Sequence, residues 1–135
     1  MVASRHTWSY QAAFEATPIS ASQARSFVVR HLVDHGLKYL VDPVRLAASE
    51  LATNALAHAH TAFIVTLEAR DKEVRLTVRD DSLSLPARRA AQVMDSSGRG
   101  LEIVDIVSSD WGIDTDAAGS KAVWASFAIR GKRDF

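Results

Sequence analysis

The chain has 135 residues with no cysteine, 16 basic and 16 acidic side chains, and an apolar fraction of 47 %. This length fits one domain over residues 1–135 that can bury a real core, and the composition is that of an ordinary soluble globular protein. Balanced charge gives no overall field toward nucleic acid or an anionic membrane. The lack of cysteine excludes disulfides, thiolate metal ligands and thiol nucleophiles, and is compatible with a reducing compartment. No apolar run approaches the roughly 20 residues of a membrane span, so we expect a cytoplasmic protein.

The first third of the chain predicts a strand followed by a helix. Aromatic and polar residues alternate over 6–16, which is the period of a half-buried strand. Ser20 and Ser22 are the candidate N-caps of the helix. Gly36 suits its C-terminal stop.

The second helix is expected to run from Asp42 as cap, with Pro43 at its first position, to about residue 60, and it carries the stretch SELATNALAHAH. Glu50, Asn54 and His58 follow one another at four-residue steps, which places them along one side of the helix. The apolar residues that share an arc on roughly that side are Val44, Ala47, Ala48, Leu51 and Ala55. Glu50 and Asn54 therefore stand at the edge of the buried arc.

Two interpretations of Glu50 and Asn54 are open at this point. Residues at the edge of a buried arc can simply face water. An asparagine among alanines and leucines lowers helix propensity, however, which makes it an odd choice for a solvent-facing position. Its carbonyl oxygen is a good ligand for Mg²⁺, and a nearby carboxylate can accept a proton or hold a water. His58 and His60 do not favour zinc, because they point in different directions and no third ligand stands at a suitable spacing.

Two strands, over 62–69 and 74–78, follow the helix and are joined by a turn at Asp71–Lys72. Residues 80–99 then show no steady period, and a connection of this length is more often functional than idle. Two interpretations of Asp80–Asp81 at its start are open. The pair can simply favour a turn, or a carboxylate there can accept a hydrogen bond from an exocyclic amine such as that of adenine.

The loop ends in Gly98-Arg99-Gly100-Leu101, which precedes a short helix over 101–107. Glycines let the backbone approach a ligand, and a helix N-terminus offers unpaired N–H groups to phosphate. A lone motif of this kind is a weak signal, and it fails the dinucleotide fingerprint. Strands over 111–115 and 122–129 complete the chain. The order of elements predicts an α+β, two-layer sandwich with helices on one face of a mixed, mostly antiparallel sheet.

The order of these signals resembles that of the GHKL or Bergerat-fold (histidine-kinase-like) ATPases, and within them the anti-sigma-factor serine/threonine kinases. ASELATNALAHA resembles the N box of that branch, VRDDSLSLP its first glycine box, and SGRGLEIVD its second. FVVRHLVDHGL matches its first helix, and GSKAVWASF is similar to its closing loop and strand. The likeness therefore covers nearly the whole chain.

The resemblance implies an ATP- and Mg²⁺-binding kinase and assigns roles to particular residues. Asn54 would bind Mg²⁺ between the phosphates, Glu50 would be the general base that activates the attacking hydroxyl, and Asp80 would bind the adenine amino group. The loop over about 83–99 would be the ATP lid. The residues that would border the phosphates or otherwise contact the nucleotide at the second glycine box are Gly98, Arg99, Gly100 and Leu101.

The implied partners are an anti-anti-sigma (STAS-type) protein, phosphorylated on serine or threonine, and a sigma factor. The resemblance also implies that the kinase is a homodimer that contacts neither nucleic acid nor membrane.

The sequence departs from the family pattern in two places. Ser82 and Ser84 occupy positions that are usually glycine in the first glycine box, and Ala122 stands where a threonine usually helps to hold adenine. They favour the alternative, a non-catalytic nucleotide-binding or nucleotide-free partner-switching module of the same fold. The retained Glu50 and Asn54 favour the kinase.

Overall fold

The computed structural model describes residues 7–58, 61–80, 98–116 and 119–130. Within these ranges the chain forms five strands, three α-helices and one short 3₁₀ helix. In chain order the elements are β1 (Trp8–Phe14), α1 (Ile19–Asp34), η2 (Lys38–Leu40), α2 (Val41–His58), β2 (Phe63–Arg70), β3 (Glu73–Asp80), α4 (Gly98–Val107), β4 (Asp110–Thr115) and β5 (Lys121–Ala128).

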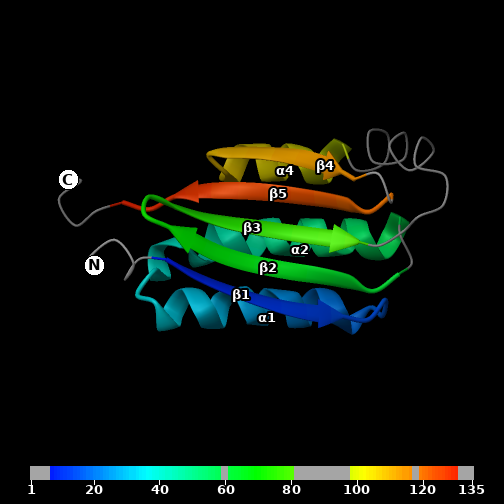
Figure 1. Cartoon of the computed structure of the whole chain (residues 1–135), viewed down its shortest axis with the longest axis horizontal. Coiled ribbons are helices and arrows are strands. Elements are labelled where there is room, and N and C mark those ends of the chain that lie inside the picture. The colour runs from blue at the N-terminus through cyan, green and yellow to red at the C-terminus, as the bar shows by residue number, and fades with distance from the viewer. Residues whose placement is uncertain (1–6, 59–60, 81–97, 117–118, 131–135) are drawn as a thin grey trace.

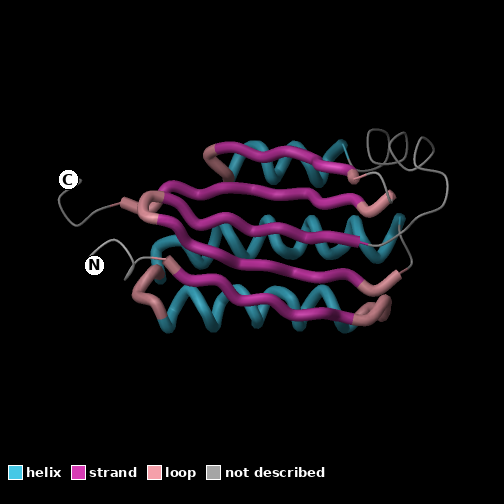
Figure 2. Tube along the Cα trace, viewed as in Figure 1, coloured by secondary structure: helices cyan, strands magenta, loops and turns pink. Residues whose placement is uncertain are grey.

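The strands form one sheet in the order β1-β2-β3-β5-β4, and the three α-helices lie behind it on a single face (Figures 1 and 2). Each of the four strand pairings is antiparallel. The predicted α+β sandwich with helices on one face is therefore confirmed, and its sheet is wholly antiparallel within the described residues rather than mixed. None of the described helices is long and apolar enough to cross a membrane.

The core lies between the sheet and the helices and follows from the alternation of the strands. Phe63, Val65 and Leu67 of β2 are buried, whereas the intervening residues of the same strand are exposed or half-buried. The apolar arc predicted for α2 is buried as well: Val44, Ala47, Ala48, Leu51 and Ala55 are at most 3 % exposed. Sequence periodicity therefore identifies the inward faces of both layers correctly.

The predicted N-caps are wrong at both long helices. Ser20 lies in the first turn of α1, where it is buried and its hydroxyl donates a hydrogen bond to the Glu15 carbonyl at 2.6 Å. Helix α2 begins at Val41, directly after η2, so Asp42 is inside its first turn and pairs with Arg45 at 3.2 Å. The stop at Gly36 is confirmed, because its φ of 74° is one that glycine adopts without strain.

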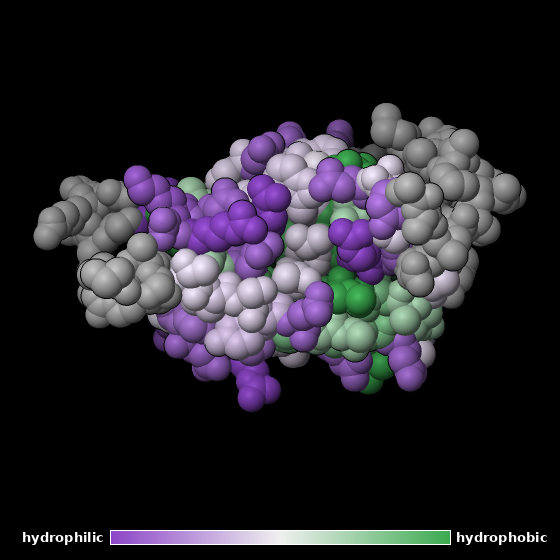
Figure 3. Space-filling model, in the orientation of Figure 1, coloured by the Kyte–Doolittle hydropathy of each residue, from purple (hydrophilic) through white to green (hydrophobic). Residues whose placement is uncertain are grey.

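The other face of the sheet is not covered by helices (Figure 1), and Figure 3 shows the molecule from this side in space-filling form. On this open face the Arg75 guanidinium lies 4.0 Å above the centre of the Trp124 ring. Gly112 of β4 is the cross-strand neighbour of Trp124, and a Cβ added there would lie 2.7 Å from the indole Cζ2. The absence of a side chain at Gly112 therefore makes room for the ring.

Candidate active site

The predicted functional residues gather at one end of the sandwich. Helix α2 runs behind the sheet and contacts both β3 and α4. The C-terminal half of α2, the last residue of β3 and the first turn of α4 all lie at the same end of the molecule (Figure 1). Three segments that are separated in the sequence are thus brought together by the fold.

Glu50 and Asn54 lie one turn apart on α2, and both side chains are half-buried. Their neighbours Leu51 and Ala55 are buried in the core, so the predicted position at the edge of the buried arc is confirmed. No hydrogen bond or ion pair joins either side chain to another residue within the described ranges. The adjacent Ser49 is different, since its hydroxyl accepts a hydrogen bond of 3.1 Å from Arg25 of α1.

Asp80, the last residue of β3, faces the helices rather than the open side. Its side chain is 2 % exposed, although the residue is charged. Its cross-strand neighbour is Lys121 at the start of β5, which is 4 % exposed. The Lys121 Nζ lies 3.7 Å from Asp80 Oδ2, which makes a buried ion pair. Burial removes the hydration of both charges, and their attraction need not repay that cost, so the pair is weak evidence for stability.

Lys121 is a residue beside Asp80 that the sequence reasoning missed. Ala122 pairs with Arg79, so its side chain points to the open face and away from Asp80. Strand side chains alternate between the two faces of a sheet, so Ala122 and Lys121 lie on opposite faces. Strand β5 begins at Lys121, one residue before its predicted start. A charged residue in phase with the buried Val123 was the available signal.

The second glycine box forms the start of α4. The helix begins at Gly98, so Gly98, Arg99 and Gly100 belong to its first turn instead of preceding it. The first N–H groups of a helix have no partner within the helix and can bind an anion. Leu101 is buried in the core, which leaves its backbone rather than its side chain for a ligand. The side chain of Arg99 lies outside what the structure describes.

Residues 14–127 match the family model of the histidine kinase-like ATPase domain. The chain belongs to this family. Thirteen chains of solved structures also match, and one is the crystal structure of the RsbU and RsbW domains of Rv1364c from Mycobacterium tuberculosis. The TM-score is 0.69 at 20 % sequence identity, over 93 % of this chain and 34 % of that chain. The likeness shows a shared fold, and this chain spans about a third of that structure's length. A search of curated proteins finds no match.

The chemistry of the candidate site in this histidine kinase-like ATPase domain is compatible with phosphate and Mg²⁺. No three histidine, cysteine or acidic side chains of the described residues form a group that could hold a metal ion. Mg²⁺ does not require such a group, because it keeps several waters and shares the oxygens of a bound phosphate. The Asn54 amide oxygen is a suitable single protein ligand, and the first turn of α4 supplies N–H donors toward phosphate.

Several predicted features lie outside the described residues. These are most of the expected lid, the serines at positions 82 and 84, and His60. The side chain of His58, the last residue of α2, is also not described.

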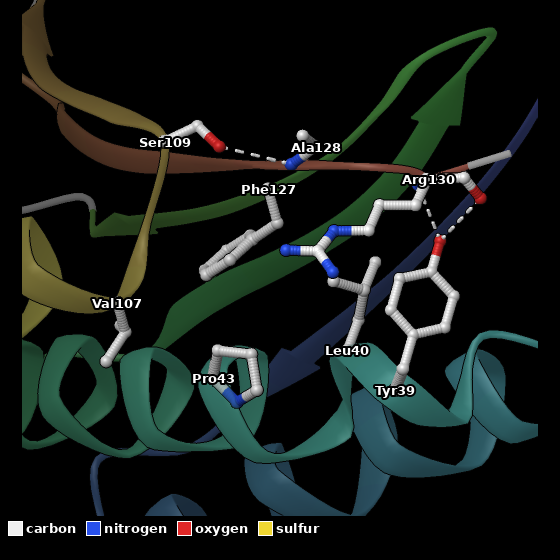
Figure 4. A pocket seen from close by; sticks show the side chains of 8 residues that line it. All are labelled: Tyr39, Leu40, Pro43, Val107, Ser109, Phe127, Ala128 and Arg130. Carbon is white, nitrogen blue, oxygen red and sulfur yellow. Dashed lines mark hydrogen bonds between the residues drawn. The ribbon is translucent and has the colours of Figure 1, made fainter. Parts of the chain in front are cut away.

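A separate cavity of about 330 Å³ lies at the opposite end of α2, near its N-terminus (Figure 4). Its lining residues are Tyr39, Leu40, Pro43, Val107, Ser109, Phe127, Ala128 and Arg130. The Tyr39 hydroxyl accepts a hydrogen bond from the Arg130 N–H at 2.8 Å and donates one to the Arg130 carbonyl at 3.3 Å. This contact ties η2 to the residues after β5. The cavity contains none of the predicted site residues.

Proposed function

We propose that this histidine kinase-like ATPase domain is an ATP-binding, Mg²⁺-dependent protein serine/threonine kinase of the anti-sigma-factor type. The observation that carries the proposal is the pairing of a half-buried carboxylate and amide on α2, Glu50 and Asn54, at the end of the sandwich where β3 finishes and α4 begins. Neither side chain is engaged by another described residue, so both are available to a ligand.

Each site residue has a chemical role in the proposal. Asn54 holds the metal through its amide oxygen, and the N–H groups of Gly98 and Gly100 in the first turn of α4 border the phosphates. Asp80 accepts a hydrogen bond from the exocyclic amine of adenine. Bound Mg²⁺ supplies charge neutralisation at the transferred phosphoryl group. Glu50 takes the proton of the attacking hydroxyl and orients its oxygen toward the phosphate.

The proposed partners follow from the same family branch. The substrate is a serine or threonine of an anti-anti-sigma protein of the STAS type, and the domain regulates a sigma factor as a cytoplasmic homodimer. The similar solved structure contains RsbU and RsbW domains, which supports a partner-switching context. No direct contact with nucleic acid or membrane is part of the proposal.

The proposal is tested by nucleotide binding and then by phosphate transfer. We expect Mg-ATP to raise the melting temperature (Tm) of the purified protein, because a ligand selective for the native state stabilises it by mass action. Labelled ATP should then transfer its γ-phosphate to a purified STAS-type partner, and peptide mapping should place the label on a serine or threonine. Binding of ATP without transfer to any candidate partner would contradict the kinase.

The rival function is a module of the same fold that switches partners without chemistry. The Asp80–Lys121 ion pair favours it, because the carboxylate that would hold adenine is already near a buried cation. Serines 82 and 84 of the sequence favour it too. An unchanged Tm at millimolar Mg-ATP, with no heat of binding in calorimetry, would support this module over the kinase.

A further inference from the structure

The cavity near the N-terminus of α2 has the size and lining of a small-molecule site (Figure 4). Its volume of about 330 Å³ lies at the small end of the range for ligand pockets, roughly 300–1,000 Å³. Phe127 and Leu40 are 2 % and 7 % exposed, so they form its floor and are held by the core. The cavity therefore offers a ligand a supported apolar surface.

Arg130 brings a positive charge to this apolar surface. Figure 4 shows its side chain extending from the end of β5 toward Phe127, with the guanidinium beside the cavity. The backbone of Arg130 is held in place, because its N–H and its carbonyl are both hydrogen-bonded to the Tyr39 hydroxyl. Tyr39 thus uses its hydroxyl as donor and acceptor, and its ring remains as a wall of the cavity.

The guanidinium of Arg130 has no counter-ion among the described residues. No hydrogen bond or ion pair joins it to another residue in those ranges. The arginines of the open face differ, since Arg70, Arg75 and Arg79 each have a nitrogen within 3.8 Å of a carboxylate oxygen. A guanidinium is permanently charged and matches a carboxylate in a bidentate pair. An unpaired guanidinium beside an apolar cavity therefore indicates an anionic group on the ligand.

The lining favours a carboxylate with an apolar body over a phosphate ester. A phosphate ester would bring a strongly hydrated, higher charge against Phe127 and Leu40, and Arg130 is the one cationic side chain that lines the cavity among the described residues. A carboxylate carries a single charge, which one arginine can satisfy. An aromatic or branched aliphatic body would pack on the Phe127 ring.

We propose that this cavity binds a small aromatic or branched aliphatic carboxylate, with Arg130 pairing to the carboxylate and the floor contacting its body. The site is separate from the proposed nucleotide site, although α2 and α4 contribute to both. Pro43 and Val107 line the cavity at one end of these helices, whereas Asn54 and Gly98 lie toward the other end. The proposal does not depend on nucleotide binding.

The test compares phenylacetate with phenylacetamide, its neutral isostere, on the full chain. Amide chemical shifts of isotope-labelled protein are followed by NMR as each compound is added in the millimolar range. We expect phenylacetate to shift the amides of Leu40, Ser109 and Ala128, which line the cavity. Its dissociation constant (Kd) should be lower than that of phenylacetamide by about tenfold or more, because charge-assisted hydrogen bonds are the stronger ones.

Two variants assign the charge effect to one residue. Arg130→Gln removes the charge of an exposed side chain that has no partner in the described ranges, so it should weaken phenylacetate by about tenfold and leave phenylacetamide unchanged. Arg70→Gln is the matched control, because Arg70 is an exposed arginine at the end of β2. It should leave both dissociation constants unchanged.

Three results would overturn the proposal. The first is an equal affinity for the two compounds, or an affinity for phenylacetate that Arg130→Gln does not change. The second is a set of shifts confined to the amides of Gly98 and Gly100, which would place the anion at the first turn of α4. The third is the absence of shifts with both phenylacetate and isovalerate, an aromatic and a branched aliphatic probe, in the millimolar range.

Discussion

The two faces of the sheet carry their charged residues in different ways. On the open face, oppositely charged side chains meet in partly exposed pairs, namely Glu68–Arg70, Glu73–Arg75 and Arg79–Asp116. Exposed pairs of this kind contribute about 0–1 kcal/mol each, so their positions say little about function. The covered face is apolar along β2 and β3 until the final pair of Asp80 and Lys121. Charge on the covered face is costly, and it is found where the nucleotide site is proposed.

The largest effect that we expect from a difference between the two faces is a loss of phosphate transfer when Glu50 is changed. In Glu50→Gln the side chain keeps its shape but loses its ability to accept a proton. We expect phosphate transfer to a STAS-type partner to fall by roughly 10² to 10⁴, the usual contribution of general-base catalysis, while Mg-ATP affinity stays nearly unchanged. The measurement is single-turnover transfer alongside calorimetry.

The matched control for this variant is Glu68→Gln on the open face. Glu68 pairs with Arg70 at 3.6 Å and lies far from α2 across the sheet, so the same chemical change should leave transfer intact. Full transfer activity in Glu50→Gln would remove Glu50 from the mechanism. Loss of folding in Glu50→Gln would instead assign this carboxylate a structural role.

A smaller effect is expected on binding through Asn54. Asn54→Ala removes the amide oxygen that is proposed to bind Mg²⁺, so the affinity for Mg-ATP should fall by roughly 10- to 100-fold and transfer should fall with it. Thr53→Ala is the control, because Thr53 is exposed on the same helix. The two variants are compared by calorimetry at several magnesium concentrations. An affinity for Mg-ATP that is unchanged in Asn54→Ala would contradict the metal-binding role.

The open face offers a stability test that should leave the proposed nucleotide site unchanged. In Gly112→Ala the new methyl group would meet the Trp124 ring at 2.7 Å, and Arg75 on the other side limits how far the ring can move. We expect the free energy of unfolding to fall by about 1–2 kcal/mol, as for other overpacked sites, with Mg-ATP affinity preserved. Denaturant unfolding measures the loss. Repeating the change in a Trp124→Leu background should reduce it, and equal losses in both backgrounds would exclude the steric explanation.

The sequence predicts residues that share one helix better than residues that meet across two strands. Glu50 and Asn54 share one helix, so their spacing alone places them on one side, at the edge of the core, as found. The neighbour of Asp80 depends on how β3 pairs with β5, which is a tertiary property. Local periodicity places the start of β5 one residue too late, and Lys121 is therefore not recognised as the neighbour of Asp80.

The helix starts are mispredicted because capping competes with neighbouring structure. Ser20 and Asp42 have the chemistry of N-caps, but η2 leads directly into α2, and the Ser20 hydroxyl is taken by the Glu15 carbonyl. Gly36 is predicted correctly because its positive φ is a local requirement that few other residues meet. Local constraints are therefore read well from this sequence, and long-range pairings are not.

A cluster of aromatic and histidine rings joins β1 to α1, away from the proposed nucleotide site. The His31 ring stacks on Tyr10 with centroids 3.8 Å apart, and the Tyr10 hydroxyl is hydrogen-bonded to His35 Nε2 at 2.7 Å. Trp8 stacks on His35 at 4.3 Å. Burial is the main cause that lowers the pKa of His31 below its ordinary value, and the nearby positive charge of Arg30 lowers it further.

The smallest expected effect is the pH dependence that follows from His31. Because its pKa is lower in the folded chain than in the unfolded chain, the unfolded chain takes up the proton first as the pH falls. The contribution of neutral His31 to stability is therefore fully present above about pH 6.5, the ordinary histidine value, and is lost as the pH falls through the folded pKa. We expect the Tm to decline as the pH falls below about 6.5, and His31→Gln to make that decline shallower. An equally steep decline of Tm in His31→Gln would show that other groups govern the acid sensitivity. A shallower decline in His31→Gln, together with an unchanged decline in His35→Gln, would assign the acid sensitivity to the His31 ring that stacks on Tyr10.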